Sequence, residues 1–236
     1  EYSLNENITD KNLLKFFHEP DLLIHLAWKG IPNYNELYHF NNLLPQYFFI
    51  QNLVDHGLKD IVVTGTCSEY GMQSGCLNEK MTSHPVNPYS ISKDSLRKLL
   101  EALFIKHHFN FKWVRLFYIY GNGQNPNSLI PLLENAIKNN TKEFNMSGGE
   151  QLRDYLKIEQ VAEIISNVAL QNKIQGIINC CSGKPISIRK FAEDYLKDRK
   201  SNIKLNLGYH PYSDNEPMAF WGDNSKLKQV LKIYDK

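Results

Sequence analysis

The chain has 236 residues, of which 42% are hydrophobic and 22% are charged, a composition typical of one large globular domain or of a domain with a smaller appendage. Its net charge is +2, and its 27 basic residues are spread along the sequence, which argues against nucleic acid and against a membrane surface as partners. No apolar run reaches the roughly 18 residues of a membrane span, and we expect neither such a span nor a signal peptide.

The four cysteines, Cys67, Cys76, Cys180 and Cys181, include no Cys-x-x-Cys spacing. Two of them are adjacent inside an apolar run. We therefore expect neither a disulfide framework nor a metal site. We also expect a reducing, cytoplasmic location.

Helical and extended patterns alternate along the chain. Short, almost continuous apolar runs are typical of strands buried on both faces, and the longer stretches between them have helical spacing. Pro45 lies inside one of the helical stretches, where it predicts a kink or a break. The predicted strands are 21–27, 60–66, 112–118 and 176–181, and the predicted helices are 13–17, 34–56, 88–108, 128–139, 158–170 and 188–200. This order indicates an α/β fold with a parallel sheet and crossover helices.

A Tyr-x-x-x-Lys sequence opens the helix predicted over 88–108. Asn87 suits the N-cap and Pro88 suits the first helical position, so Tyr89 and Lys93 lie one turn apart on the same face. A phenol ordinarily titrates near pH ~10, and a nearby ammonium favours the phenolate. The pair can therefore supply a base near neutral pH. The alternative is a chance pairing of two common residues.

The glycine-rich turn of a nucleotide-binding sheet is missing. A doubly wound sheet binds its ligand beside its first strand and the Gly-rich turn that follows. Neither G-x-x-G-x-x-G nor G-x-G-x-x-G occurs in the sequence. Without earlier strands, 22–26 would be an unpaired apolar edge. We therefore expect the remainder of a longer chain that lacks about fifty N-terminal residues, at least one strand-helix-strand unit. The alternative is a complete chain with a different fold.

Two segments, 64–71 and 87–93, resemble the catalytic signatures of the extended short-chain dehydrogenases/reductases. In that family a Ser or Thr four residues before Tyr-Gly completes a triad with the Tyr and the Lys, and Thr66 fits this position. Further matches in the right order are Ile24-His25-Leu26-Ala27, Asn41-Asn42, 115–121, Arg153-Asp154-Tyr155 and Phe220-Trp221-Gly222-Asp223. The chain is thus similar to NAD(P)-dependent nucleotide-sugar epimerases, dehydratases and reductases. The resemblance implies a doubly wound parallel sheet of Rossmann type with a small C-terminal substrate domain.

The resemblance also implies a division of the chain and a set of cofactor contacts. Residues 1–127 and 151–182 would form the remainder of the dinucleotide-binding domain, and 128–150 and 183–236 would form the substrate domain. The implied cofactor contacts are Leu26, Ala27, Asn41, Thr64, Tyr89, Lys93 and Phe117. The cofactor is NAD or NADP, and the choice stays open because the residue that reads the ribose lies on the absent second strand.

Three residues carry the implied chemistry. Tyr89 is the general acid or base on a sugar hydroxyl or carbonyl. Lys93 lowers the pKa of the phenol and hydrogen-bonds the cofactor ribose, and Thr66 fixes the reacting oxygen. The cofactor supplies the hydride transfer. The alternative for Thr66 is a hydroxyl that only caps the turn toward Gly71.

Substrate contacts follow from the later motifs. Family members with an Arg-Asp-Tyr loop and a Phe/Tyr-Trp loop act on nucleotide-diphosphate sugars, which implies such a substrate here. The implied contacts are Thr66, Cys67, Ser68, Tyr118, Leu129, Arg153 and His210. Arg153 would pair with the diphosphate or ribose, the alternative being a salt bridge to Asp154 or another acid. Tyr118 and His210 replace the Asn and Arg frequent in epimerases, which leaves the nucleotide open.

The reaction is narrowed by Cys67 and Ser68. The family's 4,6-dehydratases have Asp-Glu at these positions, and neither a thiol nor a hydroxyl has a carboxylate's pKa. We therefore expect a 4-ketoreductase or dehydrogenase acting on a deoxysugar nucleotide for surface-polysaccharide synthesis, with a 4-epimerase as the alternative. A non-catalytic dinucleotide sensor is less favoured because the whole triad is present.

A homodimer is also implied, since relatives pair helices equivalent to 34–56 and 88–108 in a four-helix bundle. The alternative is that Leu99, Leu103 and Phe104 only pack on the sheet.

Overall fold

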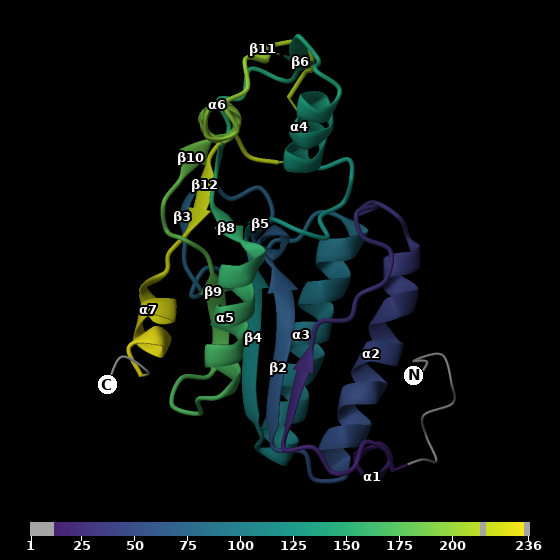
Figure 1. Ribbon diagram of the computed structural model, residues 1–236. Helices are drawn as coiled ribbons and strands as arrows, with labels where there is room; N and C mark the ends of the chain where they lie inside the picture. Colours follow the sequence, from purple (N-terminus) through teal and green to yellow (C-terminus); the bar gives the residue numbers. More distant parts are fainter. Residues whose placement is uncertain (1–11, 213–215, 234–236) are drawn as a thin grey trace.

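The centre of the molecule is a four-stranded sheet in which all neighbouring strands are parallel (Figure 1). The computed structural model describes residues 12–212 and 216–233. In spatial order the strands are β1 (Leu22–His25), β2 (Asp60–Thr66), β4 (Asn110–Leu116) and β9 (Gly176–Cys180). All four lie within the predicted strand ranges or within two residues of them, and the α/β fold predicted from the sequence is confirmed.

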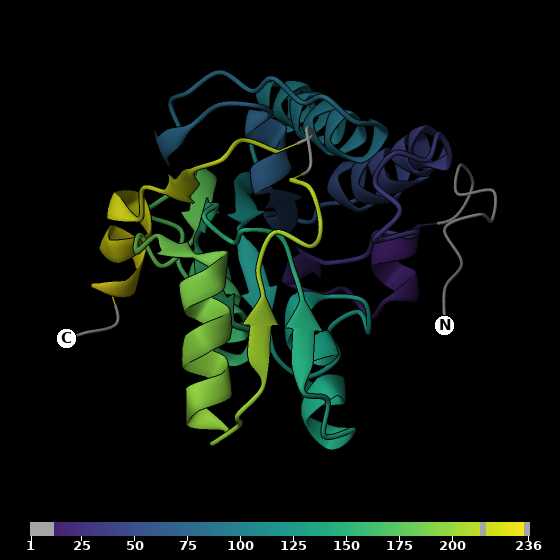
Figure 2. The ribbon, with the colours of Figure 1, turned by 90° about the horizontal axis from the view of Figure 1, so that it is seen from above.

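Helices cover both faces of this sheet. On one face lie α1 (Leu13–Phe16), α2 (Tyr38–Asp55) and α3 (Pro88–His107), and Figure 2 shows α2 and α3 side by side. On the other face lie α5 (Ile158–Ala169) and α7 (Ser225–Leu231). This is the layered arrangement of a doubly wound sheet.

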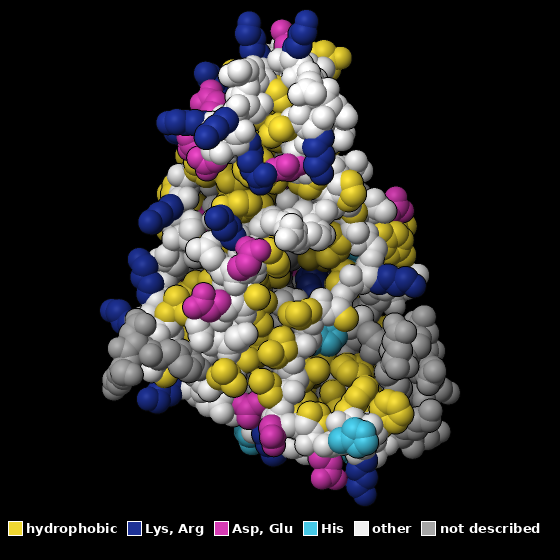
Figure 3. Space-filling model, viewed as in Figure 1, with side chains coloured by type: hydrophobic (Ala, Val, Ile, Leu, Met, Phe, Trp, Pro, Cys, Tyr) yellow, Lys and Arg dark blue, Asp and Glu magenta, His cyan; other side chains and the backbone are white. Residues whose placement is uncertain are grey.

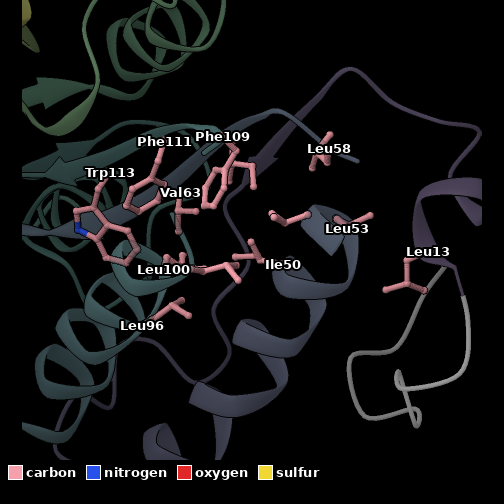
Figure 4. Packing of buried hydrophobic residues seen from close by; sticks show 13 residues of the cluster. Leu13, Ile50, Leu53, Leu58, Val63, Leu96, Leu100, Phe109, Phe111 and Trp113 are labelled. Carbon is pink, nitrogen blue, oxygen red and sulfur yellow. The ribbon is translucent and has the colours of Figure 1, made fainter. Parts of the chain in front are cut away.

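A large hydrophobic cluster holds α2 and α3 on the sheet. Alternate residues Phe109, just before β4, and Phe111 and Trp113 of β4 point toward Leu96 and Leu100 of α3 (Figure 4). The alternation follows from the two-residue period of a strand. Each fully buried side chain of this size contributes about 1.5–3 kcal/mol. Leu103 is buried in this cluster and Phe104 packs against it. These two residues therefore face the sheet, which is the alternative that the sequence analysis gave to a dimer contact.

A smaller lobe lies beyond the carboxyl ends of the sheet strands (Figure 1). Its core joins segments that are far apart in sequence, because α4 packs against α6 and β6 pairs in parallel with β11. Its elements are α4 (Leu129–Lys138), β6 (Glu143–Asn145), α6 (Ile188–Asp198) and β11 (Lys204–Asn206). The division into two domains stays a prediction. α7 lies inside the predicted substrate range 183–236 but packs on the main sheet, because Leu227 and Val230 are buried against α5 and β9.

Short ladders connect the lobe to the sheet. Of these pieces, only Tyr118 at the start of β5 fell within a predicted strand, because two or three residues are too few to show a period. They are β3 (Gly75–Leu77) with β12 (Phe220–Gly222), β5 (Tyr118–Tyr120) with β8 (Tyr155–Lys157), and β7 (Leu152–Arg153) with β10 (Ile186–Ser187). The strand predicted over 112–118 therefore divides at Phe117 into β4 and β5.

Pro45 does not end its helix. α2 runs without interruption from Tyr38 to Asp55. The sequence analysis predicted a kink or a break at Pro45, and the break does not occur. A proline inside a helix costs about 3 kcal/mol. Burial of Ile50, Leu53 and Val54 against α3 and the sheet offsets this cost.

β1 is an edge strand in the described part of the chain, as the sequence predicted. It pairs only with β2 there. Ile24 is 39% exposed and Leu26, just beyond the strand, is 58% exposed. Figure 3 shows hydrophobic side chains gathered over the lower part of this face. Among residues 12–212 and 216–233, no helix has the length and apolar character needed to cross a bilayer.

Candidate active site

The candidate site forms where β2 ends and α3 begins. β2 runs directly into the 3₁₀ turn η1 (Cys67–Tyr70), with Thr66 as its N-cap. α3 begins as predicted, with Asn87 accepting a hydrogen bond from the Ser90 backbone N–H at 2.8 Å and Pro88 in the first turn. Carboxyl ends of parallel strands and helix N-termini meet at this edge, where such sheets bind ligands.

Thr66 and Tyr89 are in contact. The Thr66 hydroxyl lies beside the phenol of Tyr89 and lowers its pKa. The Thr66 hydroxyl oxygen also accepts the Ser68 backbone N–H at 3.2 Å. Both residues are buried, Tyr89 at 7% and Thr66 at 8% exposure. The structure therefore brings two of the three predicted catalytic groups together directly.

Lys93 lies one helical turn from Tyr89 and is buried. Its ammonium lies 4.5 Å from the centre of the Trp28 ring and 5.6 Å from that of Trp113. Within the described residues no hydrogen bond or ion pair engages this ammonium. Three unsatisfied N–H donors fit the adjacent hydroxyls of a ribose. The residues present thus suit the nicotinamide-ribose end of NAD(P).

The pKa values differ from the sequence-based expectation. Burial raises the pKa of Tyr89 above its ordinary value of 10. The neighbouring Tyr34 raises this pKa further, and the Thr66 hydroxyl lowers it. Burial lowers the pKa of Lys93 to about 8, which Glu69 partly opposes. The sequence analysis expected Lys93 to lower the pKa of the Tyr89 phenol. In the protein without cofactor the pKa is instead raised, because desolvation of the phenol dominates.

Three aromatic side chains around Tyr89 were missed by the sequence reasoning. The Tyr34, His39 and Trp28 rings have centroids 5.2, 5.4 and 6.1 Å from the Tyr89 ring. His39 accepts the Trp28 indole N–H at 3.1 Å on one ring nitrogen and contacts the Asn33 carbonyl with the other. The only sequence signal for them was a high density of aromatic residues in 28–49.

The predicted cofactor residues fall at neighbouring strand ends. Leu26 and Ala27 follow β1 and are exposed, Thr64 is buried in β2, and Phe117 is buried after β4. The Thr64 hydroxyl donates to the His25 carbonyl at 3.4 Å. Asn41 is separate from them, exposed on α2.

The predicted substrate residues divide into two groups. Arg153 is fully buried, its Nη2 donates to Glu216 Oε2 at 2.9 Å, and its Nε donates to Tyr118 Oη at 3.2 Å. Tyr118 Oη in turn donates to Glu216 Oε1 at 2.8 Å. Burial raises the pKa of the Cys67 thiol to about 12, and the charge of Glu216 adds to this rise. The structure therefore brings together three of the predicted substrate contacts, Arg153, Tyr118 and Cys67.

The other predicted substrate residues contact different parts of the molecule. His210 is exposed and its ring contacts that of Tyr209, and Leu129 packs in the core of the small lobe. Ser68 is half-buried in the turn η1. The acid that pairs with Arg153 is Glu216, which the sequence reasoning did not name.

Asp154, the acid proposed as an alternative partner of Arg153, has a different role. It accepts hydrogen bonds from the Ser182 backbone and hydroxyl, from Gly183 and from Gly222. It therefore ties the loop after β9 to β12. No cluster of three or more His, Cys, Asp or Glu side chains in the described ranges could hold a metal ion.

A parallel doubly wound sheet with a Thr-Tyr-Lys group at its carboxyl edge defines a dinucleotide-dependent oxidoreductase class. Residues 4–181 match the model of the NAD dependent epimerase/dehydratase family, and the chain belongs to this family.

Two curated relatives are dehydrogenases from Aggregatibacter actinomycetemcomitans. The dTDP-6-deoxy-L-talose 4-dehydrogenase (NAD(+)) is 32% identical over 203 residues, covering 86% of this chain and 75% of the relative. The GDP-6-deoxy-D-talose 4-dehydrogenase is 27% identical over 220 residues, covering 90% of this chain and 74% of the relative.

A solved structure is similar in fold. The UDP-N-acetylglucosamine 4-epimerase from Methanobrevibacter ruminantium M1 has a TM-score of 0.84 and 23% identity, covering 95% of this chain and 74% of that structure. The chain thus spans about three quarters of the length of these proteins.

Proposed function

We propose that the chain is the NAD(P)-dependent part of an oxidoreductase that acts at C4 of a nucleotide-activated deoxysugar, as a 4-ketoreductase or 4-dehydrogenase. The placement of the Thr66 hydroxyl beside the Tyr89 phenol, with Lys93 one turn along α3, carries this proposal. The two talose 4-dehydrogenases support it, because their names describe oxidation or reduction at this carbon of a 6-deoxysugar.

The chain's own residues divide the proton chemistry. Tyr89 takes the proton from the C4 hydroxyl during oxidation, and returns it to the carbonyl oxygen during reduction. With the sugar bound, the Thr66 hydroxyl, which lies beside the phenol in the protein alone, would donate to that same oxygen and fix its position. Lys93 would hold the nicotinamide ribose with its free N–H donors. When bound, NAD(P) supplies the hydride acceptor or donor at the sugar carbon.

Dehydration is disfavoured by the turn η1. Burial and the nearby charges raise the pKa of Cys67 to about 12, so its thiol is a poor base near neutrality. Glu69 is the one carboxylate of this turn, and it is fully buried and turned toward Trp113 and Arg115. Reduction or oxidation at C4 therefore fits these side chains better than elimination of water.

Arg153 is proposed to bind the diphosphate of the nucleotide sugar. Its buried guanidinium already holds a carboxylate, that of Glu216, so the site accepts a planar anion. We assign Tyr118 to the same anion site. Leu129 and His210 remain proposed substrate contacts on the small lobe.

A homodimer through α2 and α3 is proposed as well. Leu37, Phe40, Leu44 and Phe48 recur every three or four residues and are 42–69% exposed. This spacing gives one apolar stripe along α2, on a side that faces away from the core. The protein is proposed to act in the cytoplasm, without a nucleic-acid or membrane partner.

The test is turnover of the full-length protein with 4-keto and 4-hydroxy 6-deoxyhexoses linked to dTDP, GDP and UDP, with NAD and NADP and with products resolved by NMR. We expect a stoichiometric change in NAD(P)H, which Tyr89→Phe abolishes while cofactor binding persists. An epimerase, the second candidate, would invert C4 with no net NAD(P)H change. Turnover by Tyr89→Phe at the wild-type rate would refute the proposed mechanism.

A further inference from the structure

A carboxylate that is not part of the predicted triad lies directly behind it. Glu69 is fully buried in η1. Its Oε1 accepts the Thr66 backbone N–H at 2.8 Å and the Trp113 indole N–H at 3.0 Å. Its Oε2 accepts the Arg115 Nε–H at 2.7 Å. Both oxygens are therefore engaged by donors of the protein itself.

Burial raises the pKa of Glu69, and its hydrogen-bond partners oppose this rise and favour the charged form. Every hydrogen-bond partner of its two oxygens is a donor, so a proton on the carboxyl would meet no acceptor. The Arg115 guanidinium compensates the charge, and Arg97 Nε lies 3.9 Å from the same carboxylate. Removal of one member of such a buried group leaves the others unpaired.

The chain makes room for this carboxylate at Gly65. A side chain there would begin 2.1 Å from the Trp113 indole nitrogen and 2.5 Å from Glu69 Oε1. Only glycine permits this approach of indole and carboxylate beneath the strand end.

Glu69 determines the direction of the Thr66 hydroxyl. The two residues form a capping box, in which the Glu69 carboxylate holds the Thr66 N–H and the Thr66 oxygen holds the Ser68 N–H. An oxygen that accepts from Ser68 keeps its own hydrogen free to donate. That hydrogen is then available to the Tyr89 oxygen, beside which the Thr66 hydroxyl lies.

Glu69 also acts on Lys93 through its charge. The Trp113 indole lies between them, in contact with the carboxylate and 5.6 Å from the ammonium. Burial lowers the pKa of Lys93 to about 8, and Glu69 is the group that raises it. The other titratable or charged groups around Lys93 are His25 on β1, His39 on α2, Arg115 on β4, Cys67 on η1, and Tyr89 and Arg97 on α3. Glu69 is the carboxylate among them.

We infer, on the basis of the proposed function, that Glu69 is a positioning residue of the site: it holds the backbone of Thr66 so that the hydroxyl faces Tyr89, and its carboxylate charge acts on the Lys93 ammonium across the Trp113 indole. Sugar and cofactor do not touch it.

The test compares Glu69→Gln with wild type in the reduction of the 4-keto sugar. We expect kcat at pH 7 to fall at least tenfold with KM nearly unchanged. Activity in this direction requires protonated Lys93 and declines as pH rises through its pKa. Loss of the Glu69 charge moves that decline about one pH unit toward acid, the effect of a unit charge at roughly 10 Å.

A second readout needs no turnover. In protein with ¹³C-labelled lysine, the Cε signal that Lys93→Arg removes reports the titration of Lys93. We expect its midpoint to fall by about one pH unit in Glu69→Gln. An unchanged midpoint overturns the inference even if the proposed sugar is not turned over, so the failures of the two proposals are distinguishable.

Two further variants complete the design. Asp60→Asn makes the same chemical change at the opposite end of β2, where Asp60 pairs with Lys112 at 3.5 Å, and should leave kcat and the Lys93 midpoint unchanged. Glu69→Asp keeps the charge but shortens the reach to Thr66, which covers a Gln variant that fails to fold. It should keep the Lys93 midpoint and lower kcat, and a wild-type kcat would overturn the inference.

Discussion

The ion pair between Arg153 and Glu216 leads to a prediction about ligand affinity. If the proposed anion site holds the substrate diphosphate, Glu216 occupies it in the protein alone, and a ligand must first displace this carboxylate. Glu216→Gln removes the competing charge and keeps an oxygen that can accept from Tyr118, whose Oη lies 2.8 Å from Glu216. Nucleotide binding should therefore become tighter.

The size of the effect follows from burial. Arg153 is fully buried, but the Glu216 side chain is 47% exposed, so solvent screens the pair. A hydrogen bond to a charged group contributes about 1.5–3 kcal/mol when buried, and exposure reduces it to about 1 kcal/mol. This corresponds to roughly a fivefold lower Kd and KM, with kcat unchanged because ground state and transition state gain equally.

Calorimetric titration with dTDP, GDP and UDP measures the change in Kd, and initial rates measure the change in KM. Glu193→Gln is the matched control, since Glu193 forms an ion pair with Arg189 at 2.7 Å and is exposed to a similar degree on α6. Unchanged or weaker nucleotide binding by Glu216→Gln, or an equal gain in the control, would refute the assignment of Arg153 to the diphosphate.

Three predictions concern stability and assembly. The pKa of Lys93 lies near 8 when folded and near 10.5 when exposed, so the unfolded chain binds more protons between these values and stability rises with pH across this window. Lys93→Met should raise the unfolding free energy at pH 7 by up to about 3 kcal/mol, at 1.36 kcal/mol for each unit of the gap, and should flatten the rise, both read from urea titrations at several pH values. Leu100→Ala, at a fully buried position, should cost about 2–5 kcal/mol in the same assay. Leu44→Glu, on the exposed stripe of α2, should convert the proposed dimer to a monomer in light scattering.

Each of these has an outcome that contradicts it. A pH dependence that survives in Lys93→Met would mean that another group titrates in this window. A loss below 1 kcal/mol for Leu100→Ala would mean that the cluster of α3 with β4 relaxes around the cavity. A wild-type mass that is already monomeric, or a dimer that persists in Leu44→Glu, would contradict the proposed interface.

The local parts of this fold were readable from the sequence. β2 begins and ends where its apolar run predicts, and the Asn87-Pro88 start fixes α3 to the residue. Tyr89 and Lys93 were identified from their spacing and Thr66 from the family resemblance, and the structure places the Thr66 hydroxyl beside the Tyr89 phenol. These features depend on neighbours within one strand or one helical turn.

The features that the sequence analysis missed or predicted wrongly depend on distant contacts or on solvent. Arg153 meets Glu216 63 positions away, and no local pattern signals that partner. The pKa of Tyr89 follows from burial beneath Trp28, Tyr34 and His39, which belong to other segments. The sequence analysis assigned no role to Glu69, because its three hydrogen-bond donors come together only in the folded chain.

The pairing of β12 with β3 limits how Glu216 can leave Arg153. Two residues further along, the Met218 carbonyl accepts the Leu152 N–H at 2.8 Å, and the Ala219 carbonyl accepts the Gly75 N–H at 2.9 Å. The chain is thus anchored on both flanks immediately after Glu216, and Phe220 stacks on the Arg153 guanidinium, 4.6 Å from its central carbon. Exchange of carboxylate for diphosphate at Arg153 would therefore require movement of the Glu216 side chain, while β12 stays paired with β3.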